Sequence, residues 1–459
     1  MTHTLLVQFL ALLVVFVSTL PPTTAQVLTL DGFLLQVERT HPSLRSADFE
    51  PELAEAEVRS ALGRFDPVLD VTYDYKDKAG SDKLNLFESS VELPLDVLFG
   101  PKVKASYSRG IGFQIDPQNL TSLPGQASIG VSLPVLQGIF TDARRNQLRK
   151  ALLRPDLALA QYQLERNNLL RAAALRYWDW SEAQQLVAVA DSILALADQR
   201  LQFVVRRARA GESARIDSVE IAQEVQRRIG ERYRALRISE QSAVDLGVFL
   251  WNPDGTPRPL SEVPELLPLK ADTSVRSLDA ANLARLRRPE VRRIDVIRQT
   301  SRLDSSLASE LLRPYVELQA GLVSYDVTAP SKLDYSVGFK VHQPLLFRQA
   351  NASVQTADIA VKRADLSATL VERLVEADAI NAVIALDRSR ERLVAADEEV
   401  RLARIMVDAE QRRFLSGDAS LLQVNLRERF YAEALLRQVS ARADWARALI
   451  GLRWATGTL

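Results

Sequence analysis

Residues 180–204 read WSEAQQLVAVADSILALADQRLQFV, and apolar side chains recur in them at alternating intervals of three and four. This is the spacing of a coiled-coil seam. The seam comprises Trp180, Ala183, Val187, Ala190, Leu194, Ala197, Leu201 and Val204. A second seam runs beside it through Leu186, Val189, Ile193, Leu196 and Phe203. Two adjacent seams predict a helix with helical neighbours on both sides, although a soluble bundle uses the same positions.

The second half of the chain has apolar residues at the same alternating spacing of three and four. Its seam comprises Leu393, Ala396, Val400, Ala403 and Val407. The uninterrupted helical pattern of residues 347–414 corresponds to roughly 100 Å at 1.5 Å per residue. That length favours long coiled-coil hairpins over a compact bundle. Pro155 interrupts the corresponding stretch of the first half, so we expect a kink or a short break there.

Landmarks recur in the same order in the two halves. Each half begins with two prolines 25 residues apart, which are followed by alternating segments. A proline at a strand end and a long helical stretch that ends in glycine come next. These markers are Pro42, Pro67, Pro134 and Gly211, then Pro289, Pro314, Pro344 and Gly417. We therefore predict an internal duplication, with a first repeat at 26–251 and a second at 278–459. The proline-rich residues 252–277 form the predicted linker or equatorial segment.

Several segments alternate apolar with polar residues. They are residues 69–75, 90–97, 103–111 and 127–133 in the first half, and 316–322 and 335–342 in the second. Strands of this kind are typical of outer-membrane β-barrels, although a soluble sandwich also alternates. Residues 98–101 form a tight predicted turn, whereas the connections 76–86, 114–126 and 326–334 are longer and polar. Short turns at one end and long loops at the other favour a barrel.

Composition excludes several functions for the 459-residue chain. It has 58 basic and 58 acidic residues, no cysteine and three histidines. The balanced charge argues against a nucleic-acid surface. The lack of cysteine excludes disulfides, thiolate metal sites and cysteine nucleophiles. The sequence has no phosphate-binding, zinc-protease or hydrolase motif, so we predict no enzyme activity, no metal and no cofactor.

The first 25 residues predict a secretory signal peptide. Residues 5–20 form one apolar run, which is shorter than a spanning helix and is followed by Pro21 and Pro22. Cleavage is expected after Ala25, and a permanent membrane anchor is the alternative. An exported chain without cysteine fits the bacterial envelope.

The ordered set of features resembles the TolC family of outer membrane efflux proteins. The matching stretches are HPSLRSADFE from residue 41, VSLPVLQGIFTDARRNQLRKA from residue 131, and RRFLSGDASLLQVNLRERFYAEALLRQVSARADWARALIGLRWATG from residue 412. The resemblance implies an α+β membrane protein with long coiled-coil hairpins and amphipathic strands. Three copies would jointly close a β-barrel in the cell outer membrane and an α-barrel through the periplasm.

The implied function is a passive exit duct of a tripartite efflux pump or a type I secretion system, with a periplasmic adaptor and an inner-membrane transporter as partners. The rival interpretation is a periplasmic adaptor or a coiled-coil scaffold without a channel. The family usually has two strands per half. Residues 87–113 therefore look like an added hairpin, which either widens the barrel or folds outside it.

The resemblance also implies roles for the helical tips, which dock the adaptor and form the periplasmic aperture. The tip residues predicted to dock the adaptor are Gly211, Glu212, Ser213, Gly417, Asp418, Ser420 and Leu421. The candidate aperture residues are Asp217, Gln423 and Arg427, with Arg427 as the expected partner of Asp217. Five aromatic residues are predicted either at the membrane interfaces or in strand packing: Tyr73, Tyr75, Tyr107, Tyr335 and Phe339.

Overall fold

The computed structural model describes residues 26–113, 115, 119–211, 214–267, 276–328 and 333–459. These residues form two compact units. Unit 1 contains the described residues up to Ala47, together with Leu164–Arg288 and Val375–Leu459. Unit 2 contains Asp48–Gln163 and Pro289–Leu374. The predicted signal peptide lies outside the described residues.

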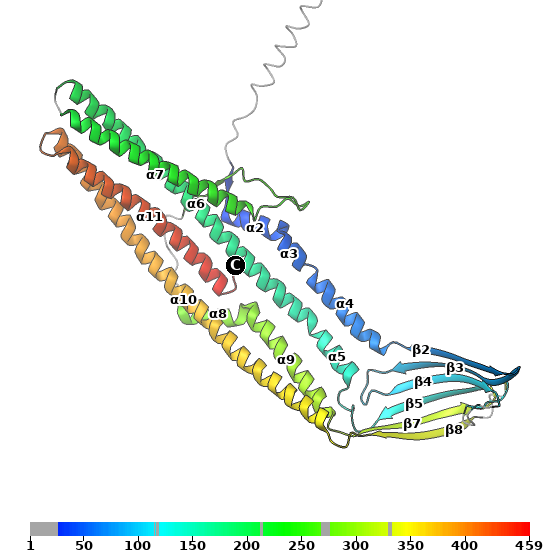
Figure 1. The fold of residues 1–459 in the computed structure, drawn as a ribbon. Coiled ribbons are helices and arrows are strands. Elements are labelled where there is room, and N and C mark those ends of the chain that lie inside the picture. Colours follow the sequence, from blue (N-terminus) through cyan, green and yellow to red (C-terminus); the bar gives the residue numbers. More distant parts are fainter. Residues whose placement is uncertain (1–25, 114, 116–118, 212–213, 268–275, 329–332) are drawn as a thin grey trace, which may run out of the picture. The chain divides into compact units, whose positions relative to one another are not determined.

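Unit 1 is built mainly from two helical hairpins (Figure 1). Helices α6 and α7 form one hairpin and α10 and α11 form the other, and α6 and α10 also extend into unit 2. The elements with residues in unit 1 are β1 (Val27–Leu28), α2 (Leu30–Thr40), α3 (Pro42–Ala47), α6 (Arg154–Arg209), α7 (Arg215–Gly247), β6 (Val263–Pro264), α8 (Ser277–Arg287), α10 (Arg348–Leu415) and α11 (Leu421–Ala455).

The core of unit 1 lies where α2, α6, α7 and α11 meet. Phe33, Tyr177, Trp180, Leu246 and Ile450 are all buried there. Burial raises the pKa of the Tyr177 hydroxyl, which therefore stays protonated at physiological pH. This hydroxyl donates to the Leu28 carbonyl at 2.5 Å and accepts from the backbone N–H of Glu265 at 3.1 Å. Tyr177 thereby fixes the parallel pair β1–β6 against helix α6.

Unit 2 combines shorter helices with an antiparallel sheet. Its elements are α4 (Glu50–Leu62), the short 3-10 helix η1 (Gly63–Phe65), β2 (Val68–Lys78), β3 (Ser81–Pro94), β4 (Lys102–Ile111), β5 (Gln126–Pro134), α5 (Ala143–Leu152), α9 (Pro289–Glu310), β7 (Tyr315–Ser324) and β8 (Asp334–His342). The first turns of α6 and the first half of α10 belong to it as well. The six strands form one sheet in the order β2-β3-β4-β5-β7-β8.

The helical predictions are confirmed in their main points. Helix α10 contains 68 residues and begins within one residue of the expected position. The break expected near Pro155 falls at Leu153, between α5 and α6. The buried members of the three predicted seams are Trp180, Ala183, Ala197, Val204, Leu393, Ala396 and Val407. All of them belong to the first seam or to that of the second half, whereas Leu196 of the interleaved seam is 44% exposed. Among the described residues, no helix combines the length and the apolar character needed to cross a membrane.

Two strand predictions are wrong in detail. Residues 76–86 do not form a long loop, because β2 and β3 continue to a two-residue turn at Ala79 and Gly80. Both turn residues have positive φ, 54° and 79°, which matches the right-handed twist of the paired strands. The strand expected to reach residue 97 ends at Pro94, which has no N–H to donate to a ladder.

Candidate functional site

The sheet of unit 2 has one apolar face and one polar face. The register aligns the apolar positions across all six strands: Leu69 pairs with Val91, Ala105 with Ile129, and Ala320 with Val337. The opposite face carries Asp70, Glu92, Lys104, Ser106, Ser128, Gln319 and Lys340. Among the described residues, many side chains of the apolar face are exposed, Leu69 by 63% and Val337 by 77%. A sheet of this kind requires an apolar medium on one side and water on the other.

The predicted aromatic residues lie on this apolar face. Tyr73, Tyr75, Tyr335 and Phe339 are exposed. Tyr107 behaves differently, because its hydroxyl donates to the Pro124 carbonyl at 3.1 Å and its ring lies 6.1 Å from that of Phe87. The four exposed rings therefore retain both predicted roles, whereas Tyr107 packs within the sheet.

The tip between α10 and α11 is closed by a glycine and a capping box. Gly417 has a φ of 87°, a backbone conformation that residues with a side chain rarely adopt. Its N–H donates to the Phe414 carbonyl at 3.2 Å. The next N–H, of Asp418, donates to Arg413 at 2.8 Å, which completes a Schellman motif. Ser420 then caps α11, and the Gln423 side chain accepts the Ser420 N–H at 3.0 Å.

The tip between α6 and α7 has a related ending. Gly211 has φ 79°, and its N–H donates to the Ala208 carbonyl at 3.3 Å. The predicted tip residues Glu212 and Ser213 lie outside the described residues. Asp217 lies in the first turn of α7, where a carboxylate interacts favourably with the helix dipole. A glycine in the left-handed region thus ends the long helix at both tips, as the sequence predicted.

The two tips lie beside one another in unit 1. Val204, Ile221 and Leu421 form a buried apolar cluster, and the rings of Phe203 and Phe414 cover it with centroids 6.5 Å apart. Beside this cluster is a groove of about 440 Å³. Its lining includes Arg207, Asp217, Glu220, Phe414, Ser420 and Leu422. Leu421, predicted to dock a partner, is instead part of the apolar cluster.

The expected pairing of Asp217 with Arg427 is not found within the chain. The Nε of Arg427 lies 3.9 Å from the Oε2 of Glu410, a carboxylate that also accepts from Arg413. Gln423, the other candidate aperture residue, caps α11 as described above. Of the three candidates, only Asp217 lines the tip groove.

A partly buried polar layer lies behind the tips and was not foreseen from the sequence. Arg200 of α6 forms an ion pair with Glu428 of α11, and Gln411 of α10 donates to the same carboxylate at 3.1 Å. The Arg200 and Glu428 side chains are only 12% and 18% exposed. Burial lowers the pKa of the Arg200 guanidinium to about 10, and the charge of Glu224 acts in the opposite direction. This layer therefore joins three long helices through one pair of opposite charges.

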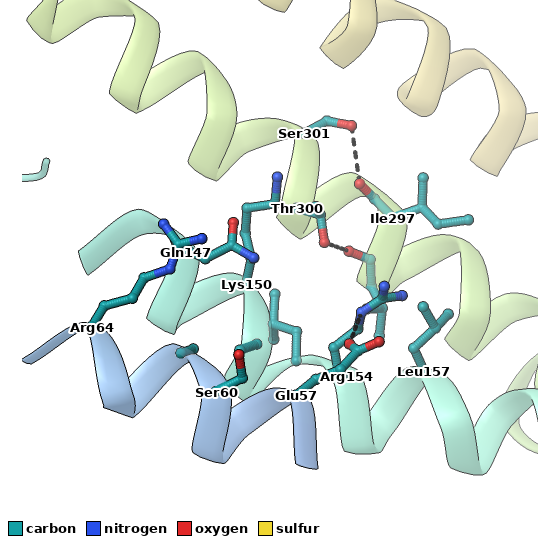
Figure 2. A pocket seen from close by; sticks show the side chains of 14 residues that line it. Glu57, Ser60, Arg64, Gln147, Lys150, Arg154, Leu157, Ile297, Thr300 and Ser301 are labelled. Atoms are coloured by element: carbon teal, nitrogen blue, oxygen red, sulfur yellow. Dashed lines mark hydrogen bonds and ion pairs between the residues drawn. The ribbon is translucent and has the colours of Figure 1, made fainter. Parts of the chain in front are cut away.

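A second groove, of about 590 Å³, lies in unit 2 between α4, α5, α6 and α9 (Figure 2). Two of its three basic residues form ion pairs: Arg154 contacts Glu57 at 2.6 Å and Lys150 contacts Asp304 at 3.0 Å. Thr300 donates to a carbonyl of its own helix. We interpret the groove as a junction between helices. In the described ranges, no group of three or more histidine or acidic side chains could hold a metal ion.

The chain resembles known proteins in sequence over its second half and in fold over nearly its whole length. The sequence profile of the family described as outer membrane efflux protein matches residues 280–458. The second half of the chain thus resembles outer membrane efflux proteins in sequence. The resemblance predicted from the sequence is thereby confirmed. No protein of curated function matches the chain by sequence.

Solved structures of outer-membrane channels share the fold of this chain. MtrE of Neisseria gonorrhoeae, in an open state, is 15% identical with a TM-score of 0.66, covering 93% of this chain and 88% of its own. CmeC of Campylobacter jejuni is 11% identical with a TM-score of 0.64, covering 94% and 85%. The VceC protein of Vibrio cholerae is 12% identical with a TM-score of 0.64, covering 93% and 96%. The long helices and the antiparallel sheet therefore form a TolC-like fold.

The structure also shows exposed apolar residues at the tips that the sequence did not predict. Ile216 and Val219 on α7, Leu415 on α10 and Leu422 on α11 are exposed. Leu422 is 66% exposed, immediately after the buried Leu421. The signal available in the sequence was the placement of apolar residues next to the tip glycines, away from the heptad positions.

Proposed function

We propose that this chain is the outer-membrane channel of a tripartite efflux pump or a type I secretion system. The observation that carries the proposal is the sheet, in which every strand presents apolar residues to one face and polar residues to the other. The match of residues 280–458 to the efflux protein family and the TolC-like fold support it. The channel is a homotrimer that lies in the outer membrane, extends through the periplasm and acts passively.

The proposal includes two partners at the helical tips. A periplasmic adaptor binds the exposed apolar side chains Ile216, Val219, Leu415 and Leu422 near the tip glycines. An inner-membrane transporter supplies the energy. Exposed apolar side chains beside polar ones are the composition expected of a surface that docks another protein.

Reconstitution tests the proposed function. The mature chain is extracted from outer membranes in detergent, purified and added to a planar lipid bilayer. A channel gives discrete conductance steps and a threefold particle by electron microscopy. A monomer that stays in solution without detergent and conducts no ions would instead support the rival interpretation, an adaptor or scaffold.

Substituting Asp217 with alanine tests the aperture. Because Asp217 lines the tip groove, we expect the Asp217→Ala channel to show a resting conductance several-fold above that of the unmodified channel. Asp198→Ala, at an exposed acidic residue of α6, is the matched control. Equal resting conductance of both variants and the unmodified channel would remove Asp217 from the aperture.

Lengthening the second tip tests adaptor docking. Inserting Asp-Lys after Gly417 lengthens the loop between the Schellman motif and the Ser420 cap and displaces Leu422. We expect at least a tenfold loss of photocrosslinking from position 422 to the adaptor, with trimers intact on gels. A photocrosslinker at Glu391, an exposed residue of α10, serves as the background control. If crosslinking persists after the insertion, the adaptor docks elsewhere.

A further inference from the structure

The sheet of unit 2 ends in two open edges. Among the described strands, β2 pairs with β3 alone and β8 pairs with β7 alone. These edge strands have 11 and 9 residues, and neither contains a proline. On β8, the apolar residues Tyr335, Val337 and Phe339 are more than three-quarters exposed. A long apolar edge without protection pairs readily with another strand, and an open edge is not tolerated in lipid.

The direction of the strands identifies the partner. All five pairings within the sheet are antiparallel, and the number of strands is even. Strand β8 therefore runs opposite to β2. When β8 of one copy lies beside β2 of another, the two strands are antiparallel, and their apolar faces can lie on the same side of the joined sheet. A second copy of this chain thus fits each edge.

The added strands β3 and β4 are part of the sheet itself. They lie between β2 and β5 and are hydrogen-bonded on both sides. Side chains on the polar face support the same pairing: Lys102 contacts Glu92 at 2.8 Å, and the hydroxyls of Ser106 and Ser128 lie 2.7 Å apart. Removing β3 and β4 from the sheet would break the ladders on both of their sides.

We propose that β8 of each copy pairs with β2 of the next, so that three copies close a barrel of eighteen strands. The proposal rests on the trimer of the proposed function. Two strands per half, as is usual in the family, would give twelve strands. Because barrel diameter grows roughly in proportion to strand number, this barrel is about 1.5 times as wide. Barrels of 16 to 18 strands leave an open aqueous channel, so the outer-membrane end admits a bulkier cargo.

Counting the strands tests the proposal directly. Electron microscopy of the full mature chain in lipid nanodiscs is expected to show eighteen strands around a threefold axis. A threefold particle with a twelve-stranded wall, and with residues 81–111 outside it, would overturn this inference and leave the proposed function standing. The absence of any threefold particle would contradict both.

Disulfide trapping tests the edge pairing independently, because the chain has no cysteine of its own. Thr72→Cys on β2 is combined in turn with Ser336→Cys, Gly338→Cys and Lys340→Cys on β8, which sample three registers of the polar face. We expect at least one pair to give covalent trimers on non-reducing gels. Thr72→Cys with Ser106→Cys, two strands apart in the sheet, is the control and should give none. Intact trimers with no covalent product from any β8 pair would overturn the pairing.

Discussion

The Glu428→Ala variant is expected to lower the stability of the tip region by about 3 kcal/mol, because the substitution removes the carboxylate that pairs with the largely buried Arg200 guanidinium and leaves only the charge of Glu224 to balance it. The Arg200 side chain is only 12% exposed, so it gains little hydration in exchange for the lost carboxylate. Of its other neighbours, the Asn425 side-chain oxygen at 3.4 Å is neutral, and Glu224 contributes its charge without a direct ion pair to Arg200. Hydrogen exchange of the backbone amides in residues 195–209 and 421–430 should accelerate about 100-fold or more.

Two control variants distinguish the effect of an unpaired charge from a nonspecific loss of stability caused by the substitution. Glu398→Ala removes an exposed carboxylate that pairs with Arg401 on the same helix, and it should change stability by less than about 1 kcal/mol. Arg200→Met combined with Glu428→Leu removes both buried charges and should restore most of the protection. If Glu428→Ala exchanges no faster than Glu398→Ala, the pair does not hold the tips together.

The Val337→Arg variant is expected to reduce membrane assembly strongly. Val337 lies in the middle of β8 on the apolar face and is 77% exposed within the chain. An arginine on the lipid face near the bilayer midplane costs about 2–4 kcal/mol per copy, and a trimer carries three. We expect a loss of most heat-modifiable trimer from the outer-membrane fraction, measured by gel shift.

The neighbouring residue supplies a matched control. Ser336 lies next to Val337 but points to the polar face, and it pairs with Gly321 of β7. Ser336→Arg adds the same charge to the same strand and should leave the trimer yield nearly unchanged. Equal losses in the two variants would mean that the apolar face is not in contact with lipid.

The sequence alone determined the helices and most strands. Apolar residues spaced by three and four lie on one face of a helix, and Trp180, Ala183 and Leu393 on such faces are buried. Periodicity therefore predicts the helix and its buried face without tertiary information. Glycine is needed at both helix ends because only a residue without Cβ readily adopts a φ near 80°, as at Gly211 and Gly417. These are local constraints, and local constraints are visible in one sequence.

Tertiary structure decided the rest, because the remaining features depend on residues far apart in the chain. The hairpin at Ala79–Gly80 looked like a loop, since polar residues flank a turn whose alanine has an unusual positive φ. The Arg200–Glu428 pair joins helices 228 residues apart, and no spacing rule connects them. The same holds for Arg427, which contacts Glu410 and not Asp217. Whether β3 and β4 belong to one sheet was settled by backbone hydrogen bonds between strands, which the alternation of a single strand does not specify.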